Sequence, residues 1–143
     1  MSIKINLTGF DDLLSQIEKA GGKIDKAAEQ CLKQSANIMQ AELKTQMQNA
    51  DVDSGLINRM PPPQFEKEGN RYAARVGYKK GAYNPNNLSD GYEVVFINFG
   101  TPKRKPTQIK ARGFIAKAKK KARPQIKKKQ ENTLNEILRG LNG

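Results

Sequence analysis

The chain contains no histidine and no tryptophan, and a single cysteine, Cys31, among its 143 residues. Histidine is the commonest general acid or base near neutral pH and the commonest metal ligand, so serine-type triads, Cys-His dyads and Cys/His zinc sites are excluded. Cys31 has no partner for a disulfide within the chain, which fits a reducing compartment. No stretch of about 18 apolar residues and no secretory signal pattern is present, so the sequence predicts a soluble protein made inside the cell.

The length leaves room for one domain, and we expect residues 1–143 to form it. A chain of this size buries roughly two-thirds of the surface that it exposes when unfolded. A hydrophobic core without disulfides or a structural metal is therefore expected.

Positive charge is concentrated at one end of the chain. Residues 1–102 hold 12 basic and 12 acidic side chains, whereas residues 103–143 hold 14 basic side chains and only two acids, Glu131 and Glu136, so the net charge of +12 lies in the last 41 residues. Like charges at this density repel one another until a surface of opposite charge neutralises them. The pattern indicates a surface that meets phosphate or an acidic protein, and the alternative is a solvated helix face.

The N-terminal half predicts a strand followed by helix. Ile3, Ile5 and Leu7 alternate with polar residues, which is typical of a half-buried strand over residues 2–7. Apolar residues then recur at helical spacing through residues 10–48, interrupted at Gly21 and Gly22. We therefore expect one long amphipathic helix that is bent or offset at the two glycines.

The middle of the chain predicts a loop and a long hairpin. Residues 51–70 carry three consecutive prolines and a Glu/Lys/Gly cluster, so a loop is expected there. Residues 71–99 read as a hairpin with a long tip loop over residues 81–91, which is rich in Asn, Pro and Gly. The returning strand, residues 92–99, is apolar on both faces, so a helix or a neighbouring subunit must cover each side.

A basic loop over residues 102–113 precedes a second helical pattern over residues 114–141. Pro124 falls inside this pattern, and proline removes a backbone donor and clashes with the preceding turn, so we expect a break near residues 121–123 and two C-terminal helices. The fold class expected is α+β: a small, mainly antiparallel β-sheet packed against one long N-terminal helix, with a basic C-terminal helical segment.

No pattern of catalytic or metal-binding residues stands out. Asp51, Asp53 and Gly55 suggest a calcium loop, but the glycine comes one place too early for an EF-hand. A metal-dependent nuclease needs clustered carboxylates, and the acids here are scattered along the chain. We therefore expect no enzyme, no metal and no cofactor.

Four short motifs occur in an order that resembles the head–tail joining or tail-completion family of long-tailed bacteriophages, a gene-product-ten-like family of minor tail components. They are Leu-Thr-Gly-Phe-Asp at residues 7–11, Ser-Gly-Leu-Ile at 54–57, Phe-Ile-Asn-Phe-Gly-Thr at 96–101 and Ala-Arg-Gly-Phe-Ile at 111–115. The resemblance spans nearly the whole chain, and it rests on the order and spacing of the motifs. The motif residues carried over are Phe99, Gly100, Thr101 and Phe114.

The resemblance implies a structural virion component that acts by assembly and forms a ring at the neck, between the head connector and the tail tube. Partners would be other neck, connector or tail-tube proteins, with a homo-oligomeric ring in the virion and a monomer when isolated. The protein would be located in the virion neck or tail, and in the bacterial cytoplasm during assembly. A ring needs heterologous contacts between neighbouring subunits, and the candidates for these contacts are Tyr83, Tyr92 and Phe96.

The basic C-terminal segment has two possible partners, the DNA that passes through the ring and an acidic protein rim. We favour the protein, because tight DNA binding would hinder passage of the genome. The alternative function is a free-standing basic nucleic-acid-binding protein. In either case the charged surface would consist of Lys103, Arg104, Lys105, Lys110, Arg112, Lys117, Lys119, Lys120, Lys121, Arg123, Lys127, Lys128 and Lys129.

Overall fold

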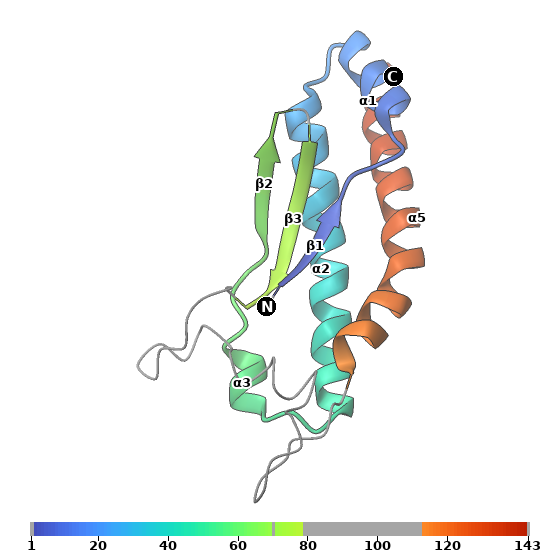
Figure 1. The fold of residues 1–143 in the computed structure, drawn as a ribbon. Coiled ribbons are helices and arrows are strands. Elements are labelled where there is room, and N and C mark those ends of the chain that lie inside the picture. The colour runs from blue at the N-terminus through green and yellow to red at the C-terminus, as the bar shows by residue number, and fades with distance from the viewer. Residues whose placement is uncertain (1, 70, 79–112, 143) are drawn as a thin grey trace, which may run out of the picture.

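Three antiparallel strands and four helices make up the part of the chain that the computed structural model describes, residues 2–69, 71–78 and 113–142 (Figure 1). The expected α+β class is confirmed. In chain order, the elements are β1 (Ser2–Asn6), α1 (Asp11–Lys19), α2 (Ile24–Asn49), α3 (Ser54–Asn58), β2 (Gln64–Glu68), β3 (Arg71–Gly77) and α5 (Phe114–Asn142).

The sheet has the order β1-β3-β2, with both neighbours antiparallel to the central strand β3. Ile3 lies opposite Val76 and Ile5 opposite Ala74, and all four side chains are buried. The alternate positions carry exposed side chains such as Lys4, because successive residues of a strand point to opposite faces. One face of the sheet is therefore apolar, and it packs on α2.

The hairpin differs from the one expected. Strand β3 pairs with β2 and β1, so its hairpin partner precedes it in the chain, and the expected return strand at residues 92–99 lies outside the described residues. Two residues, Gly69 and Asn70, separate β2 from β3, and Gly69 has a φ of +58°. Glycine adopts this left-handed conformation without steric cost, and a two-residue loop containing it suits a tight hairpin.

The expected loop over residues 51–70 is wrong in part, because α3 and β2 both lie inside it. Leu56 and Ile57 anchor α3 in the core, where they are 2% and 4% exposed. Tertiary packing of these two side chains therefore holds a five-residue helix that would not be stable alone.

The N-terminal helical region, expected over residues 10–48, consists of two helices. Helix α1 ends at Lys19 and α2 begins at Ile24, with Gly21 between them at a φ of +94°. The backbone N–H of Gly22 donates to the Ile17 carbonyl at 2.9 Å, which closes the last turn of α1. The two glycines therefore end one helix and allow the chain to start another.

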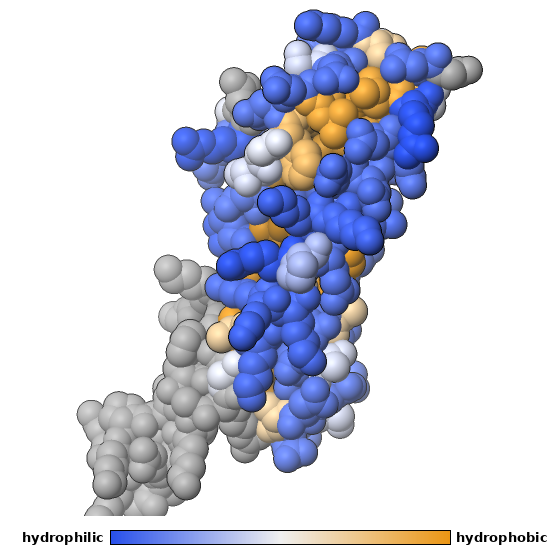
Figure 2. All heavy atoms as spheres, turned by 90° about the vertical axis from the view of Figure 1, so that its right-hand side faces the viewer, coloured by the Kyte–Doolittle hydropathy of each residue, from blue (hydrophilic) through white to orange (hydrophobic). Residues whose placement is uncertain are grey.

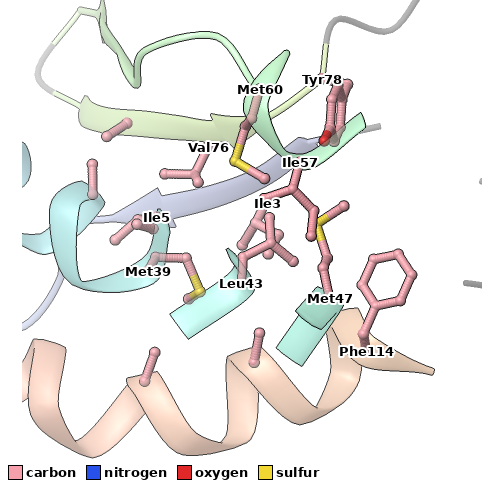
Figure 3. Packing of buried hydrophobic residues seen from close by; sticks show 14 of the residues in the cluster. Ile3, Ile5, Met39, Leu43, Met47, Ile57, Met60, Val76, Tyr78 and Phe114 are labelled. Carbon is pink, nitrogen blue, oxygen red and sulfur yellow. The ribbon is translucent and has the colours of Figure 1, made fainter. Parts of the chain in front are cut away.

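Helix α2 packs against the sheet on one side and against α5 on another, so it is buried on two sides. Met39, Leu43 and Met47 face the sheet and the start of α5 (Figure 3). Cys31 and Ser35 are fully buried beside α5, where the Cys31 thiol contacts the Gln130 carbonyl. The contacts of α2 with both the sheet and α5 explain why apolar residues recur at helical spacing along its whole length.

Helix α5 runs without interruption from Phe114 to Asn142, so the break expected near residues 121–123 and the division into two C-terminal helices are wrong. Pro124 lies inside the helix and its side chain is exposed, so the carbonyl that loses its helical donor sits on the outer side, where water can solvate it. Buried side chains at four-residue intervals on both sides of Pro124 pack against α2 and keep the two halves in line. This row consists of Phe114, Ala118, Ala122, Ile126, Gln130 and Leu134.

Candidate functional site

Helix α5 carries the net positive charge of the described residues, because acidic and basic side chains are equal in number over residues 2–69 and 71–78. The buried row of α5 takes every fourth position, and basic side chains occupy most of the intervening ones over residues 117–129, a length of about 18 Å. All of these side chains are exposed to solvent. We call this surface the basic face; it consists of Lys117, Lys119, Lys120, Lys121, Arg123, Lys127, Lys128 and Lys129.

The remaining sites expected from the sequence lie outside the described residues, with the exception of Phe114. They comprise the basic residues Lys103, Arg104, Lys105, Lys110 and Arg112, the motif residues Phe99, Gly100 and Thr101, and the contact candidates Tyr83, Tyr92 and Phe96.

Phe114 is a core residue. Its side chain is 0% exposed and belongs to the cluster between the sheet, α2 and α5, where it lies next to Met47 (Figure 3). It is the first residue of α5, and it follows Gly113, which has a φ of +60°. Phe114 therefore anchors the start of α5 and fixes where the basic face begins.

A groove of about 590 Å³ lies between β1 and α5, and sequence analysis did not predict it. Strand β1 contributes residues 3–6, α2 contributes Met39, and α5 contributes basic side chains that include Arg123. The alternation of residues 2–7 predicted a strand, but no local pattern shows that this strand forms the edge of a sheet beside a basic helix.

The end of the molecule formed by α1 and the C-terminal part of α5 carries apolar side chains at its surface. Figure 2 shows this patch as an apolar area on an otherwise mostly hydrophilic side. Leu13, Ile137 and Leu138 are half-buried there, and Leu141 is 38% exposed. Leu13, Ile137 and Leu138 pack against the smaller core cluster around Ile17.

Cys31 is not placed for nucleophilic chemistry. It is 0% exposed, and burial raises the pKa of its thiol to about 12. The thiol is therefore neutral at physiological pH, and the thiolate is the nucleophilic form. Its Sγ–H group donates to the Gln130 carbonyl at 3.8 Å, which ties α2 to α5.

Carboxylates do not converge in the described part of the chain. Glu66 pairs with Arg75 across β2 and β3, and Glu68 lies two residues along the same strand. Asp90 and Glu93, the other acids near the expected hairpin, lie outside the described residues. Within residues 2–69, 71–78 and 113–142, no group of three His, Cys, Asp or Glu side chains could hold a metal ion.

A small ionic cluster joins the sheet to the start of α2. The Tyr72 hydroxyl donates to Asp25 Oδ1 at 2.6 Å, and Lys67 Nζ lies 3.0 Å from both carboxylate oxygens. The hydrogen bonds from Tyr72 and then Lys67 lower the pKa of Asp25 below its ordinary value of 3.8. The same bond to Asp25 raises the pKa of Tyr72 to about 12.

These shifts predict how the cluster contributes to stability as pH changes. The raised pKa of Tyr72 means that its contribution is complete below pH 10 and is lost as the pH rises from 10 to about 12. The lowered pKa of Asp25 means that its contribution is complete above pH 3.8 and is lost below that value. We expect Tyr72→Phe to be less stable than wild type in urea denaturation at pH 8, with a gap that narrows above pH 10. A gap that stays constant to pH 12 would contradict the bond to Asp25.

Comparisons of the chain with protein-family models, with curated proteins and with solved structures gave no match. Among the described helices, none is both long enough and apolar enough to cross a membrane. The geometry of the basic face and of the groove is therefore the basis on which a function can be proposed.

Proposed function

We propose that this protein is a structural virion component of a tailed bacteriophage or prophage, acting in head–tail joining or tail completion by ring assembly at the neck. The observation that carries the proposal is the basic face, eight cations at exposed positions of α5. The order of the four sequence motifs supports the assignment to a phage neck.

The arrangement of the basic face suits a docking role. The buried row of α5 holds the helix on α2, so the cations project from a fixed support instead of a flexible tail. Complementary charge accelerates the encounter with an acidic surface and sets its orientation. An acidic rim on a connector or tail-tube protein is the partner that we favour for the basic face.

Mixing experiments with the connector and tail-tube proteins encoded by neighbouring genes test the proposal. We expect a ring-shaped complex by electron microscopy and a matching mass by light scattering. The double variant Lys120→Glu, Lys128→Glu, with both changes on the basic face, is expected to weaken assembly at least about tenfold.

The matched control is the double variant Lys26→Glu, Lys33→Glu, which makes the same change in net charge on exposed positions of α2. We expect this control to assemble like wild type. No complex with any connector or tube protein, or equal loss in both double variants, would contradict docking through the basic face.

The alternative function is a free-standing nucleic-acid-binding protein, and the density of cations on α5 is the observation that favours it. Binding to phosphates weakens steeply with salt, because each contact releases bound counterions. A monomer that still binds duplex DNA with micromolar or tighter affinity above about 0.2 M salt would favour this alternative over neck assembly.

A further inference from the structure

Within residues 2–69, 71–78 and 113–142, no strand pairs with the outer edge of β1, and β1 pairs only with β3. The N–H of Leu7 donates to the Tyr72 carbonyl at 3.3 Å, so Leu7 and the alternate residues Ile5 and Ile3 direct their backbone groups toward β3. The N–H and C=O groups of Lys4 and Asn6 then face the opposite way, into the groove.

Helix α5 forms the opposite wall of this groove. Lys119, Arg123 and Lys127 line it and are exposed. They recur every four residues, which places them about 6 Å apart along the helix axis. Alternate residues of a β-strand are spaced by about 6.6–6.8 Å. A strand with acidic residues at every second position therefore matches this row of cations one to one.

The floor of the groove is apolar, apart from one buried amide that has no hydrogen-bond partner among the described residues. Ile5, Met39 and Ile126 line it and are 5–7% exposed, so the floor is apolar. Gln130 also lines it, and its side-chain Nε2, although the residue is only 5% exposed, has no hydrogen-bond partner among the described residues. An occupant that offers an oxygen could accept from this amide after a small rotation, which would remove the cost of an unsatisfied buried donor.

The described helices and strands leave a place for such a strand. Helix α2 lies beneath the sheet, whereas α5 lies beside α2 and extends past β1 (Figure 1). A strand added to the outer edge of β1 would lie over α5, as β1 and β3 lie over α2. Apolar surface of Met39 and Ile126 would then be covered on the side of the groove.

We propose that the groove binds an extended acidic segment of a partner polypeptide, which pairs with Lys4 and Asn6 as a fourth strand and sets its carboxylates against Lys119, Arg123 and Lys127. The complementary charge of the wall selects an acidic partner over a neutral one. This inference deepens the proposed function. It rests on that function in one respect only, the identity of the partner as another virion protein.

Peptide binding to the isolated full chain tests the inference without any virion component. The probe is a labelled nine-residue peptide with alternating Glu and Thr, measured by fluorescence anisotropy. We expect saturable binding, and we expect it to weaken at least about tenfold in Arg123→Glu, which reverses a charge of the groove wall. Lys128→Glu is the matched control, because Lys128 is exposed on α5 but does not line the groove, and its affinity should match wild type.

The variant Asn6→Pro tests strand pairing. Proline has no N–H, and it is tolerated on edge strands where that group faces outward, so the change removes one donor to the occupant while the bonds to β3 remain. We expect an unchanged circular dichroism spectrum and a loss of peptide binding. A peptide with alternating Glu and Pro keeps the carboxylates but favours the polyproline II conformation, and it should not bind.

Several results would overturn the inference while leaving ring assembly through the basic face standing. They are no binding of the Glu/Thr peptide, equal weakening in Arg123→Glu and Lys128→Glu, or equal binding of the Glu/Pro peptide. Duplex DNA that displaces the peptide in an Arg123-dependent manner would assign the groove to nucleic acid. A wild-type oligomer that Asn6→Pro dissociates would assign it to a second copy of this chain. Conversely, a failed mixing experiment with intact peptide binding would reject the neck assignment alone.

Discussion

Replacing Phe114 with alanine is expected to lower the free energy of unfolding by about 3–5 kcal/mol, the range typical of truncating a fully buried aromatic side chain. Phe114 is 0% exposed and packs with the core cluster that joins the sheet, α2 and α5. Small domains have a total stability of roughly 5–15 kcal/mol, so the variant should be close to the limit of folding. Urea denaturation monitored by circular dichroism measures the change.

Phe65→Ala is the matched control, because it removes the same atoms from a side chain that is 39% exposed. The Phe65 ring stacks on Tyr72 with centroids 6.3 Å apart, so a loss of about 1 kcal/mol is expected there. Equal losses in the two variants would contradict the placement of Phe114 in the core. A much larger loss at Phe114 would establish that this motif residue acts through packing.

Pro124→Ala is expected to raise the free energy of unfolding by about 2 kcal/mol. Proline is about 3 kcal/mol less favourable than alanine inside a helix, and part of the gain is offset because alanine also makes the unfolded chain more flexible. The alanine N–H can donate to the Lys120 carbonyl, and the exposed position leaves room for the change. The midpoint of urea denaturation should increase without a change in slope.

Glu131→Ala is the control for this variant. It changes an exposed residue of the same helix but adds no backbone hydrogen-bond donor. Its stability should stay within about 0.5 kcal/mol of wild type. A loss of stability in Pro124→Ala would contradict a continuous α5 and would favour two helices that need the proline at their junction.

The spacing of apolar residues along the sequence predicted the elements that bury one regular face, such as β1 and α2. Ile3 and Ile5 alternate because one face of β1 packs on α2, and the stripe of α2 recurs at helical spacing because its sides are buried. The hairpin of β2 and β3 was harder to predict, because it lies in a segment whose prolines favour a loop. The two residues between the strands include Gly69, and a two-residue connection with a glycine is sufficient for a hairpin.

The features that could not be predicted from the sequence depend on contacts between residues that are far apart in the chain. Local chemistry at Pro124 predicts a break, and only the packing of residues such as Ala122 and Ile126 on α2 outweighs it. The cations of α5 were expected to form a partner surface, but nothing near Arg123 in the sequence indicates that it faces β1 across a groove. This groove joins residues of β1 and α5 that are more than 100 positions apart, and it exists only once both elements have packed on α2.

The two edges of the described sheet differ in how they discourage unwanted pairing. Strand β2 presents Glu66, Lys67 and Glu68 in succession, and charged residues of this kind hinder the approach of another strand. Strand β1 has less charge of its own and instead faces the lysine and arginine side chains of α5. Two identical copies approaching through β1 would bring like charges together, so electrostatic repulsion, which added salt weakens, disfavours pairing of two chains through this strand. Repulsion between cations therefore protects the outer edge of β1 from pairing with a second copy, although its backbone groups have no partner among the described residues.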